Sequence, residues 1–117
     1  TPTIVLRDGK VAMVPGSPGG ATTLATVANI ILSVADHGLN IQQADAAPSF
    51  HNHFLPDTVS LEPGFSPATL SALQSMGYTL KFRHAWGDGE CIEVDPKTGT
   101  LSAGQDHRQN YGKAGAY

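Results

Sequence analysis

The chain has 117 residues, a net charge of -3 and one cysteine, so it is at most one domain and can form no internal disulfide. Its apolar content of 40% is ordinary for a globular protein, and the acidic balance argues against nucleic acid or an anionic membrane surface as a partner. No apolar run approaches the roughly 18 residues of a membrane span. The opening Thr1-Pro2-Thr3 does not resemble a signal peptide, so we expect any targeting signal to lie outside this sequence.

Two β-rich runs, residues 3–7 and 10–14, begin the chain. They flank Asp8-Gly9, which is the strongest kind of two-residue signal for a hairpin with a type I′ turn. The second run leads directly into Pro15-Gly16-Ser17-Pro18-Gly19-Gly20, which we call the glycine corner. We therefore expect the end of a strand to hold the glycine corner in place.

The glycine corner is the first candidate for chemistry, because a helix pattern follows it. Glycine lets a backbone adopt positive φ and approach a ligand closely, and the first amides of a helix have no internal partner and favour negative charge. The corner could thus hold an anion or a developing oxyanion, although many such corners are simple turns. A phosphate loop is excluded, since Ala21, Thr22 and Thr23 follow and the required lysine is missing.

Residues 21–37 carry the longest apolar helix pattern, with Gly38 just beyond it as a termination signal. Its polar residues form one narrow stripe, namely Thr22, Thr26, Asn29 and Ser33. We predict a helix that is buried on most sides, with a sheet against one side and more protein against the other. This chain need not supply all of that cover.

Two shorter helices have clear boundary signals. Asn40, with a capping-box glutamine three residues later, begins a helix that Pro48 ends, and Ser66-Pro67 begins a second helix that Gly77 closes. Further strands are predicted at residues 58–61, 78–83, 91–94 and 100–102, the last two flanking the loop 95–99 as a second hairpin. The sequence therefore predicts a mixed fold in which helices and strands alternate irregularly.

Two features invite a chemical interpretation that we do not favour. His51 and His53 resemble part of a metal site, but no third ligand stands at a defined spacing, so we expect no metal and interpret them as structural or surface residues. Cys91 lies in a strand-like run, which favours a buried small apolar side chain over a nucleophile.

A series of short segments then occurs along essentially the whole chain: Pro2-Thr3-Ile4-Val5, Gly16-Ser17-Pro18-Gly19-Gly20, Gly38-Leu39-Asn40, Ala47-Pro48-Ser49-Phe50-His51, Leu55-Pro56-Asp57, Gly64-Phe65-Ser66-Pro67 and Ala114-Gly115-Ala116-Tyr117. In content and order this series resembles the end of the small subunit of γ-glutamyltranspeptidases. The resemblance implies an α+β fold, part of the four-layer αββα sandwich of N-terminal nucleophile hydrolases, which both subunits build. Residues 1–117 then form a single segment, the C-terminal part of the small subunit.

The resemblance also implies a chemistry. In that family a precursor cleaves itself to expose an N-terminal threonine, which attacks γ-glutamyl amides such as glutathione and passes the acyl group to water, an amino acid or a peptide. The glycine pair of the oxyanion hole falls on Gly19 and Gly20, which are thereby both catalytic and substrate-binding candidates, in agreement with the interpretation of the glycine corner. The resemblance implies no cofactor and no metal, and a periplasmic or secreted location.

The parts of the family's active site that this chain lacks matter equally. The catalytic threonine and the serine pair that holds the glutamyl group lie upstream of the matched segment, and the arginine for the substrate carboxylate belongs to the large subunit. We therefore expect the chain to be inactive alone and to need the rest of its precursor as its partner. Thr1 could in principle use its own amine as base, but it aligns well past the family's cleavage site.

Two alternatives to an enzyme segment remain open from the sequence. The chain could be a non-catalytic binding or scaffold module on the same fold. Asp106-His107-Arg108 stands where many relatives carry Asp-Pro-Arg, and this departure from the family pattern argues against assigning a subbranch of the family. The chain could also be an independent binder of a metal or small molecule through its histidines, namely His51, His53, His84 or His107.

Overall fold

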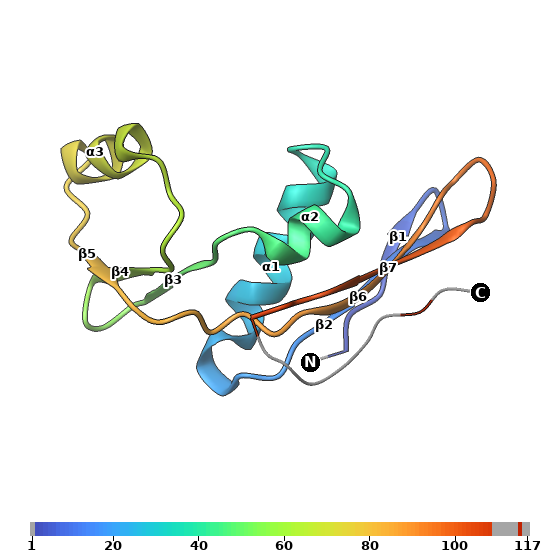
Figure 1. Cartoon of the computed structure of the whole chain (residues 1–117), viewed down its shortest axis with the longest axis horizontal. Helices are drawn as coiled ribbons and strands as arrows, with labels where there is room; N and C mark the ends of the chain where they lie inside the picture. The colour runs from blue at the N-terminus through green and yellow to red at the C-terminus, as the bar shows by residue number, and fades with distance from the viewer. Residues whose placement is uncertain (1, 109–114, 116–117) are drawn as a thin grey trace.

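The computed structural model describes residues 2–108 and 115, and these form two sheets and three α-helices, which confirms the predicted α+β class. The larger sheet has the order β1-β2-β6-β7, and the smaller one has the order β3-β4-β5. Figure 1 shows that they belong to separate lobes. The bounds of the strands are β1 Val5–Arg7, β2 Lys10–Gly16, β3 Phe50–His53, β4 Thr58–Leu61, β5 Leu80–Phe82, β6 Glu90–Val94 and β7 Leu101–Gln105; those of the helices are α1 Thr23–Ala35, α2 Ile41–Ala46 and α3 Pro67–Ser75.

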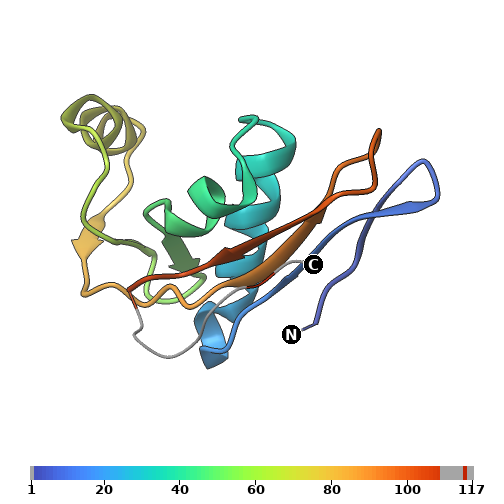
Figure 2. The ribbon, with the colours of Figure 1, turned by 45° about the vertical axis from the view of Figure 1, so that its right-hand side comes forward.

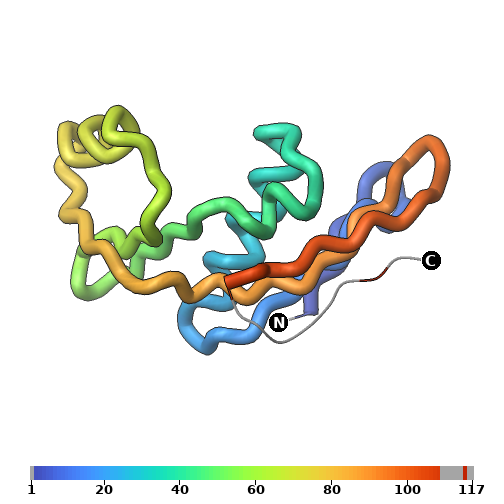
Figure 3. The backbone as a smooth tube through the Cα atoms, viewed as in Figure 1, coloured from blue at the N-terminus to red at the C-terminus, as the bar shows by residue number. Residues whose placement is uncertain are grey.

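The larger sheet brings the first two strands of the chain beside its last two, as the tube in Figure 3 shows. β2 pairs antiparallel with β6, so that Val14 lies opposite Ile92 and Pro15 opposite Cys91. Asp8 and Gly9 both have positive φ, of 51° and 76°, which is the conformation that a type I′ turn requires. Both predicted hairpins are therefore present, and they lie side by side in one antiparallel sheet.

Helices α1 and α2 cover one face of this sheet, as Figure 2 shows. The core between them contains Ile30 from α1, Ile41 and Ala44 from α2, and Cys91 from β6. Burial raises the pKa of the Cys91 thiol to about 12, so the group stays protonated near neutral pH. The expectation of a buried, chemically inert cysteine is confirmed.

Helix α1 is buried on part of its surface only, because the described residues supply only part of the cover that its apolar pattern predicts. Thr26, which belongs to the predicted polar stripe, is 2% exposed, whereas Leu24 is 72% exposed. Thr26 can be buried because its hydroxyl donates to the carbonyl of Thr22, at 3.1 Å, and so needs no water. The exposed Leu24 lies on a side of α1 that the described part of the chain leaves uncovered.

The face of the larger sheet opposite α1 and α2 carries exposed apolar side chains. Strand side chains alternate between faces, and Met13 and Cys91 are buried toward the helices, so the neighbouring Val14 and Ile92 point away from them. Both are exposed, as is Leu101 on the adjacent strand. The chain thus supplies one sheet layer and one helix layer, with an apolar surface on the outside of the sheet.

The second lobe consists of the β3-β4-β5 sheet and α3. Ser66 caps α3 as predicted, since its Oγ accepts a hydrogen bond from the amide of Thr69 at 3.1 Å. The sequence analysis missed β3, because its alternating histidines concealed a strand that pairs with β4. The radius of gyration is 15.0 Å, compared with about 13 Å for a compact domain of this length, so the lobe projects from the rest. Within the described residues, the helices are all too short or too polar to span a bilayer.

Candidate active site

The glycine corner lies where β2 ends and the first helical turn begins. A short 3-10 turn, Gly20–Thr22, precedes α1, so the α-helix starts slightly later than the sequence predicted. Gly19 has φ 127° and Gly20 has φ 59°, a region that side chains with a Cβ rarely adopt. A Cβ on Gly19 would also lie 3.0 Å from Oγ1 of Thr22, whereas one on Gly20 would meet nothing within 4 Å. Both positions therefore need glycine for conformation, and Gly19 needs it for space as well.

Two amides of this corner, those of Gly19 and Gly20, have no hydrogen-bond partner among the described residues. Neither Gly19 nor Gly20 donates a backbone hydrogen bond to any residue in the described part of the chain, and both are exposed. The carbonyls around them are engaged instead. Ser17 Oγ donates to the carbonyl of Pro18 at 2.7 Å, and Thr22 Oγ1 donates to the carbonyl of Gly19 at 3.0 Å. The corner is thus held in one conformation while two adjacent N–H groups remain available to an acceptor.

The histidines do not assemble a metal site. The rings of His51 and His53 lie 5.4 Å apart on β3, but among residues 2–108 and 115 no three His, Cys, Asp or Glu side chains are grouped so as to hold a metal ion. Partial burial lowers the pKa of His51, and the neighbouring His53 lowers it further. His51 therefore favours the neutral form, and we interpret both histidines as structural residues on the strand.

A buried ion-pair cluster, consisting of Glu62, Asp106 and Arg108, joins the two lobes. The guanidinium of Arg108 forms ion pairs with both carboxylates, and its Nε donates to Asp106 Oδ1 at 2.7 Å. The same guanidinium donates to the carbonyls of Asp45 and Ala47, at 2.8 and 3.2 Å. Burial alone would lower the pKa of Arg108, but its hydrogen bonds with Asp106 and the charge of Glu62 outweigh burial and raise it. Arg108 is therefore permanently charged and fully paired.

Backbone amides complete the pairing of Glu62. Its Oε1 accepts hydrogen bonds from the amides of Trp86 and Gly87, at 2.6 and 3.0 Å, and its Oε2 accepts one from the amide of Ser49 at 2.7 Å. A Cβ on Gly87 would overlap the guanidinium of Arg108, so only glycine fits there. The sequence analysis did not identify Glu62, because nothing in its local pattern distinguishes a buried glutamate from a surface one.

Asp45 lies beside this cluster and was also missed. It is 2% exposed, and neither oxygen of its carboxylate has a hydrogen-bond partner in the described part of the chain. Burial raises the pKa of Asp45 to about 7, and the negative charge of Asp106 adds to the shift, while Arg108 opposes it. Asp45 is thus a buried acid that is half protonated near neutral pH.

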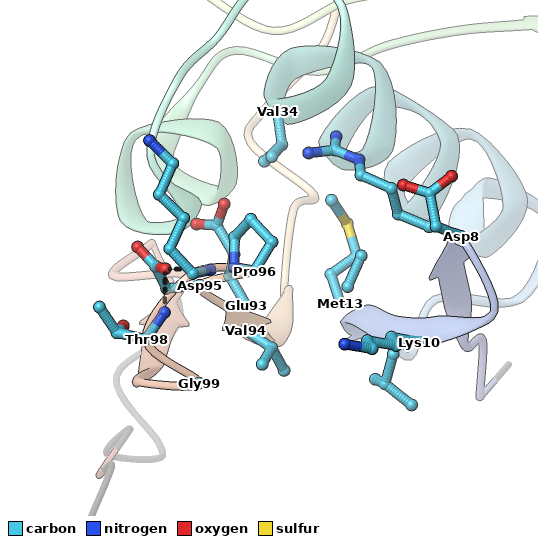
Figure 4. A pocket seen from close by; sticks show the side chains of 14 residues that line it. Asp8, Lys10, Met13, Val34, Glu93, Val94, Asp95, Pro96, Thr98 and Gly99 are labelled. Atoms are coloured by element: carbon cyan, nitrogen blue, oxygen red, sulfur yellow. Dashed lines mark hydrogen bonds between the residues drawn. The ribbon is translucent and has the colours of Figure 1, made fainter.

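A pocket lies far from the glycine corner, at the opposite end of β2. It has a volume of about 470 Å³ and is formed by the Asp8 turn, Val34 and the loop 95–99. Figure 4 shows Met13 and Val34 between the two hairpin ends, with charged side chains around them. The carboxylate of Asp95 is already engaged, since it accepts hydrogen bonds from the amides of Lys97 and Thr98 at 2.7 and 2.8 Å. We therefore do not assign the chemistry to this pocket.

Known proteins similar to this chain match it over most of its length. Residues 1–116 match the Gamma-glutamyltranspeptidase family. The glutathione hydrolase proenzyme of Escherichia coli (strain K12) is 42% identical over 108 residues, which cover 92% of this chain and 18% of that protein. Scoloptoxin SSD20 of Scolopendra dehaani is 31% identical over 109 residues, covering 92% of this chain and 55% of that protein.

Solved structures agree with the sequence matches. A gamma-glutamyltranspeptidase variant from Helicobacter pylori superposes with a TM-score of 0.87 at 38% identity, over 93% of this chain and 60% of that one. The enzyme from Pseudomonas nitroreducens complexed with L-DON gives a TM-score of 0.82 at 30% identity, over 100% of this chain and 62% of that one. The predicted N-terminal nucleophile hydrolase fold is thereby confirmed, and the chain spans only part of each of these relatives. Because both the sequence match and the structural match extend over nearly its whole length, the chain belongs to the γ-glutamyltranspeptidase family.

Proposed function

We propose that residues 1–117 are one segment, the C-terminal part of the small subunit of a γ-glutamyltranspeptidase, and that they supply the oxyanion hole of that enzyme. The complete protein cleaves γ-glutamyl amides such as glutathione and transfers the γ-glutamyl group to water, amino acids or peptides through an acyl-enzyme. Family membership and relatives named glutathione hydrolase support this proposal. Its location, by the same reasoning, is the periplasm or the outside of the cell.

The observation that carries the proposal is that the amides of Gly19 and Gly20 find no hydrogen-bond partner within residues 2–108 and 115. When a threonine hydroxyl attacks the γ-carbonyl, the carbonyl oxygen becomes an oxyanion in a tetrahedral intermediate. Donors that are already oriented stabilise that charge without a reorganisation cost, and losing one such donor costs roughly 3 to 4 kcal/mol of transition-state stabilisation. The glycine corner provides two adjacent donors on a fixed strand end, which is the arrangement that this chemistry needs.

The nucleophile and the substrate-holding groups then come from the rest of the precursor, which is the partner that the exposed sheet face fits. Val14, Ile92 and Leu101 form an apolar surface on the side of the sheet that α1 and α2 leave open. A second sheet of the sandwich would bury this surface, and its burial would attach the segment to the remaining subunit parts. The described residues show no cluster suited to an alternative, metal-dependent function.

The test is made in the full precursor, with a matched pair of glycine substitutions. Gly20 and Gly38 have similar φ values, of 59° and 67°, and open space where a Cβ would stand, so valine imposes comparable backbone strain at each. Gly20→Val is expected to lower kcat about a hundredfold to a thousandfold with little change in KM, because its amide acts mainly in the transition state. Gly38→Val should keep kcat within about threefold of wild type, since its strain is far from the chemistry.

Maturation is first checked by gel, because the same amides could assist self-cleavage. A mature, folded Gly20→Val enzyme with wild-type turnover would show that the glycine corner is only a turn. A full precursor that carries an intact threonine yet forms no acyl-enzyme with a γ-glutamyl substrate would instead favour the non-catalytic scaffold.

A further inference from the structure

We propose that Thr22 and Ser17 are positioning residues for the reaction, each holding one of the two oxyanion-hole peptides by its carbonyl. This inference rests on the proposed function. It starts from the observation that two side-chain hydroxyls converge on the glycine corner and that each donates to a carbonyl rather than to solvent.

The peptide between Gly19 and Gly20 carries the carbonyl of Gly19 and the N–H of Gly20. Since this peptide is planar and trans, these two groups point in opposite directions, and fixing the carbonyl fixes the direction of the amide. Thr22 fixes the carbonyl twice, through Oγ1 at 3.0 Å and through its own N–H at 3.3 Å. Thr22 therefore sets the direction in which the Gly20 amide donates.

The peptide between Pro18 and Gly19 is held in the same way. It carries the carbonyl of Pro18 and the N–H of Gly19, and Ser17 Oγ donates to that carbonyl at 2.7 Å. Ser17 is itself buried, so its position is determined by the packing around it. Each of the two hydroxyls thus fixes the direction of one amide.

The Gly19–Gly20 peptide has the greater need of such a tether, because a glycine stands on each side of it. Rotating this peptide changes only ψ of Gly19 and φ of Gly20, and glycine adopts most values of both at little cost. Without a tether the amide would sample several directions, and reorganisation would oppose oxyanion binding. We therefore expect Thr22 to matter more than Ser17.

The tether is anchored in a rigid part of the fold. Thr22 is the N-cap of α1, and its carbonyl accepts a hydrogen bond from Thr26 Oγ1 at 3.1 Å. Thr26 is buried against the rest of the chain. A hydrogen bond to the carbonyl side of a peptide also polarises its N–H, so Thr22 both orients the Gly20 amide and strengthens it as a donor.

The experiment compares Thr22→Val with Thr22→Ser in the mature enzyme made from the full precursor. Valine keeps the shape of threonine and removes the hydroxyl, whereas serine keeps the hydroxyl and removes the methyl group. Thr22→Val is expected to lower kcat about threefold to tenfold at nearly unchanged KM, and Thr22→Ser should restore most of the loss. Ser17→Ala is a second, independent variant, with a smaller expected loss of about threefold. Thr98→Val is the matched control, because it removes a hydroxyl that donates to Thr100 Oγ1 at 2.8 Å in the loop 95–99, at the end of the larger sheet away from the glycine corner. It should leave kcat within twofold.

A γ-glutamyl boronic acid provides a second measurement, because its tetrahedral adduct with the nucleophile places an oxygen where the oxyanion forms. Thr22→Val should weaken this adduct by the same factor as kcat/KM, and should leave the affinity for a competitive amide ligand unchanged. Unaltered kcat and boronate affinity in mature Thr22→Val, or a loss in Thr22→Ser as large as in Thr22→Val, would overturn the positioning role of Thr22. Should Thr22→Val fail to mature, Ser17→Ala decides the matter by the same two measurements. A wild-type kcat in Thr22→Val together with a lowered kcat in Gly20→Val would contradict the positioning role of Thr22 and support the oxyanion hole. A wild-type kcat in both variants would contradict both proposals.

Discussion

The glycine corner and the ion-pair cluster differ in whether their polar groups have partners. At the corner, two amides on exposed residues have no partner within the described chain, although the carbonyls beside them are held by hydroxyls. In the cluster, Glu62 is buried, Arg108 is half-buried, and each has several partners. Unpaired donors are tolerable where water can reach them, whereas unpaired charges in the interior are costly. We therefore attribute chemistry to the corner and cohesion between the lobes to the cluster.

The largest expected effect concerns the corner in isolation. The chain alone, residues 1–117, should not hydrolyse a chromogenic γ-glutamyl anilide above the rate in buffer, because an oxyanion hole stabilises an intermediate that only a nucleophile can create. Hydrolysis by the pure chain that disappears on Thr1→Ala would contradict this expectation and make Thr1 the nucleophile.

The next effect concerns the cluster. Arg108→Met would leave Glu62 and Asp106 buried without their cation, and should lower the free energy of unfolding by about 3 to 5 kcal/mol. The matched control is Arg83→Met, since Arg83 is exposed and only stacks over Trp86, at 5.6 Å, so its loss should cost under about 1 kcal/mol. Urea unfolding of the mature enzyme measures both. Equal stabilities of the two variants would show that the cluster is not what joins the lobes.

The free energy of unfolding should also depend on pH, because of the buried carboxyl group of Asp45 beside the same cluster. Its pKa is raised to about 7 in the folded chain, compared with an ordinary value near 4, so the folded state holds a proton that the unfolded state releases. The contribution of Asp45 to stability should therefore decrease as pH rises from about 4 to about 7, by up to about 1.4 kcal/mol per pH unit, and stay constant above that. Asp45→Asn should remove this slope and stabilise the enzyme at pH 8 by about 1 to 3 kcal/mol. The prediction fails if unfolding between pH 5 and 8 has the same pH dependence in both proteins.

The smallest effect concerns the exposed sheet face. The chain alone should self-associate through this face, and Ile92→Lys should raise its dissociation constant about tenfold, because the side chain is already 40% exposed and loses only part of its burial. Phe54→Lys, at an exposed residue of the other lobe, is the control and should leave association unchanged. Light scattering across a concentration series measures both. A monomer at all concentrations, with cooperative melting, would show that the sheet face needs no cover.

Local signals in the sequence determined a large part of this structure. The Asp8-Gly9 turn, the capping box at Asn40 and the Ser66-Pro67 helix start all lie where the sequence predicted them, because each depends on backbone conformation and hydrogen bonds within a few residues. The same is true of the need for glycine at Gly19 and Gly20, since positive φ is a property of the single residue.

Long-range packing decided the rest. Glu62 and Arg108 are 46 residues apart in sequence, and only the folding of the two lobes onto one another makes them partners. Which side of α1 faces the protein interior, the side with Thr26 or the side with Leu24, depends on the neighbouring elements that the chain supplies. The helical pattern alone contains no information about those neighbours. The sequence by itself thus determined where the chain turns and which residues allow it to do so. Only the tertiary structure decided which polar groups are buried and paired, because burial and pairing join residues that no local pattern connects.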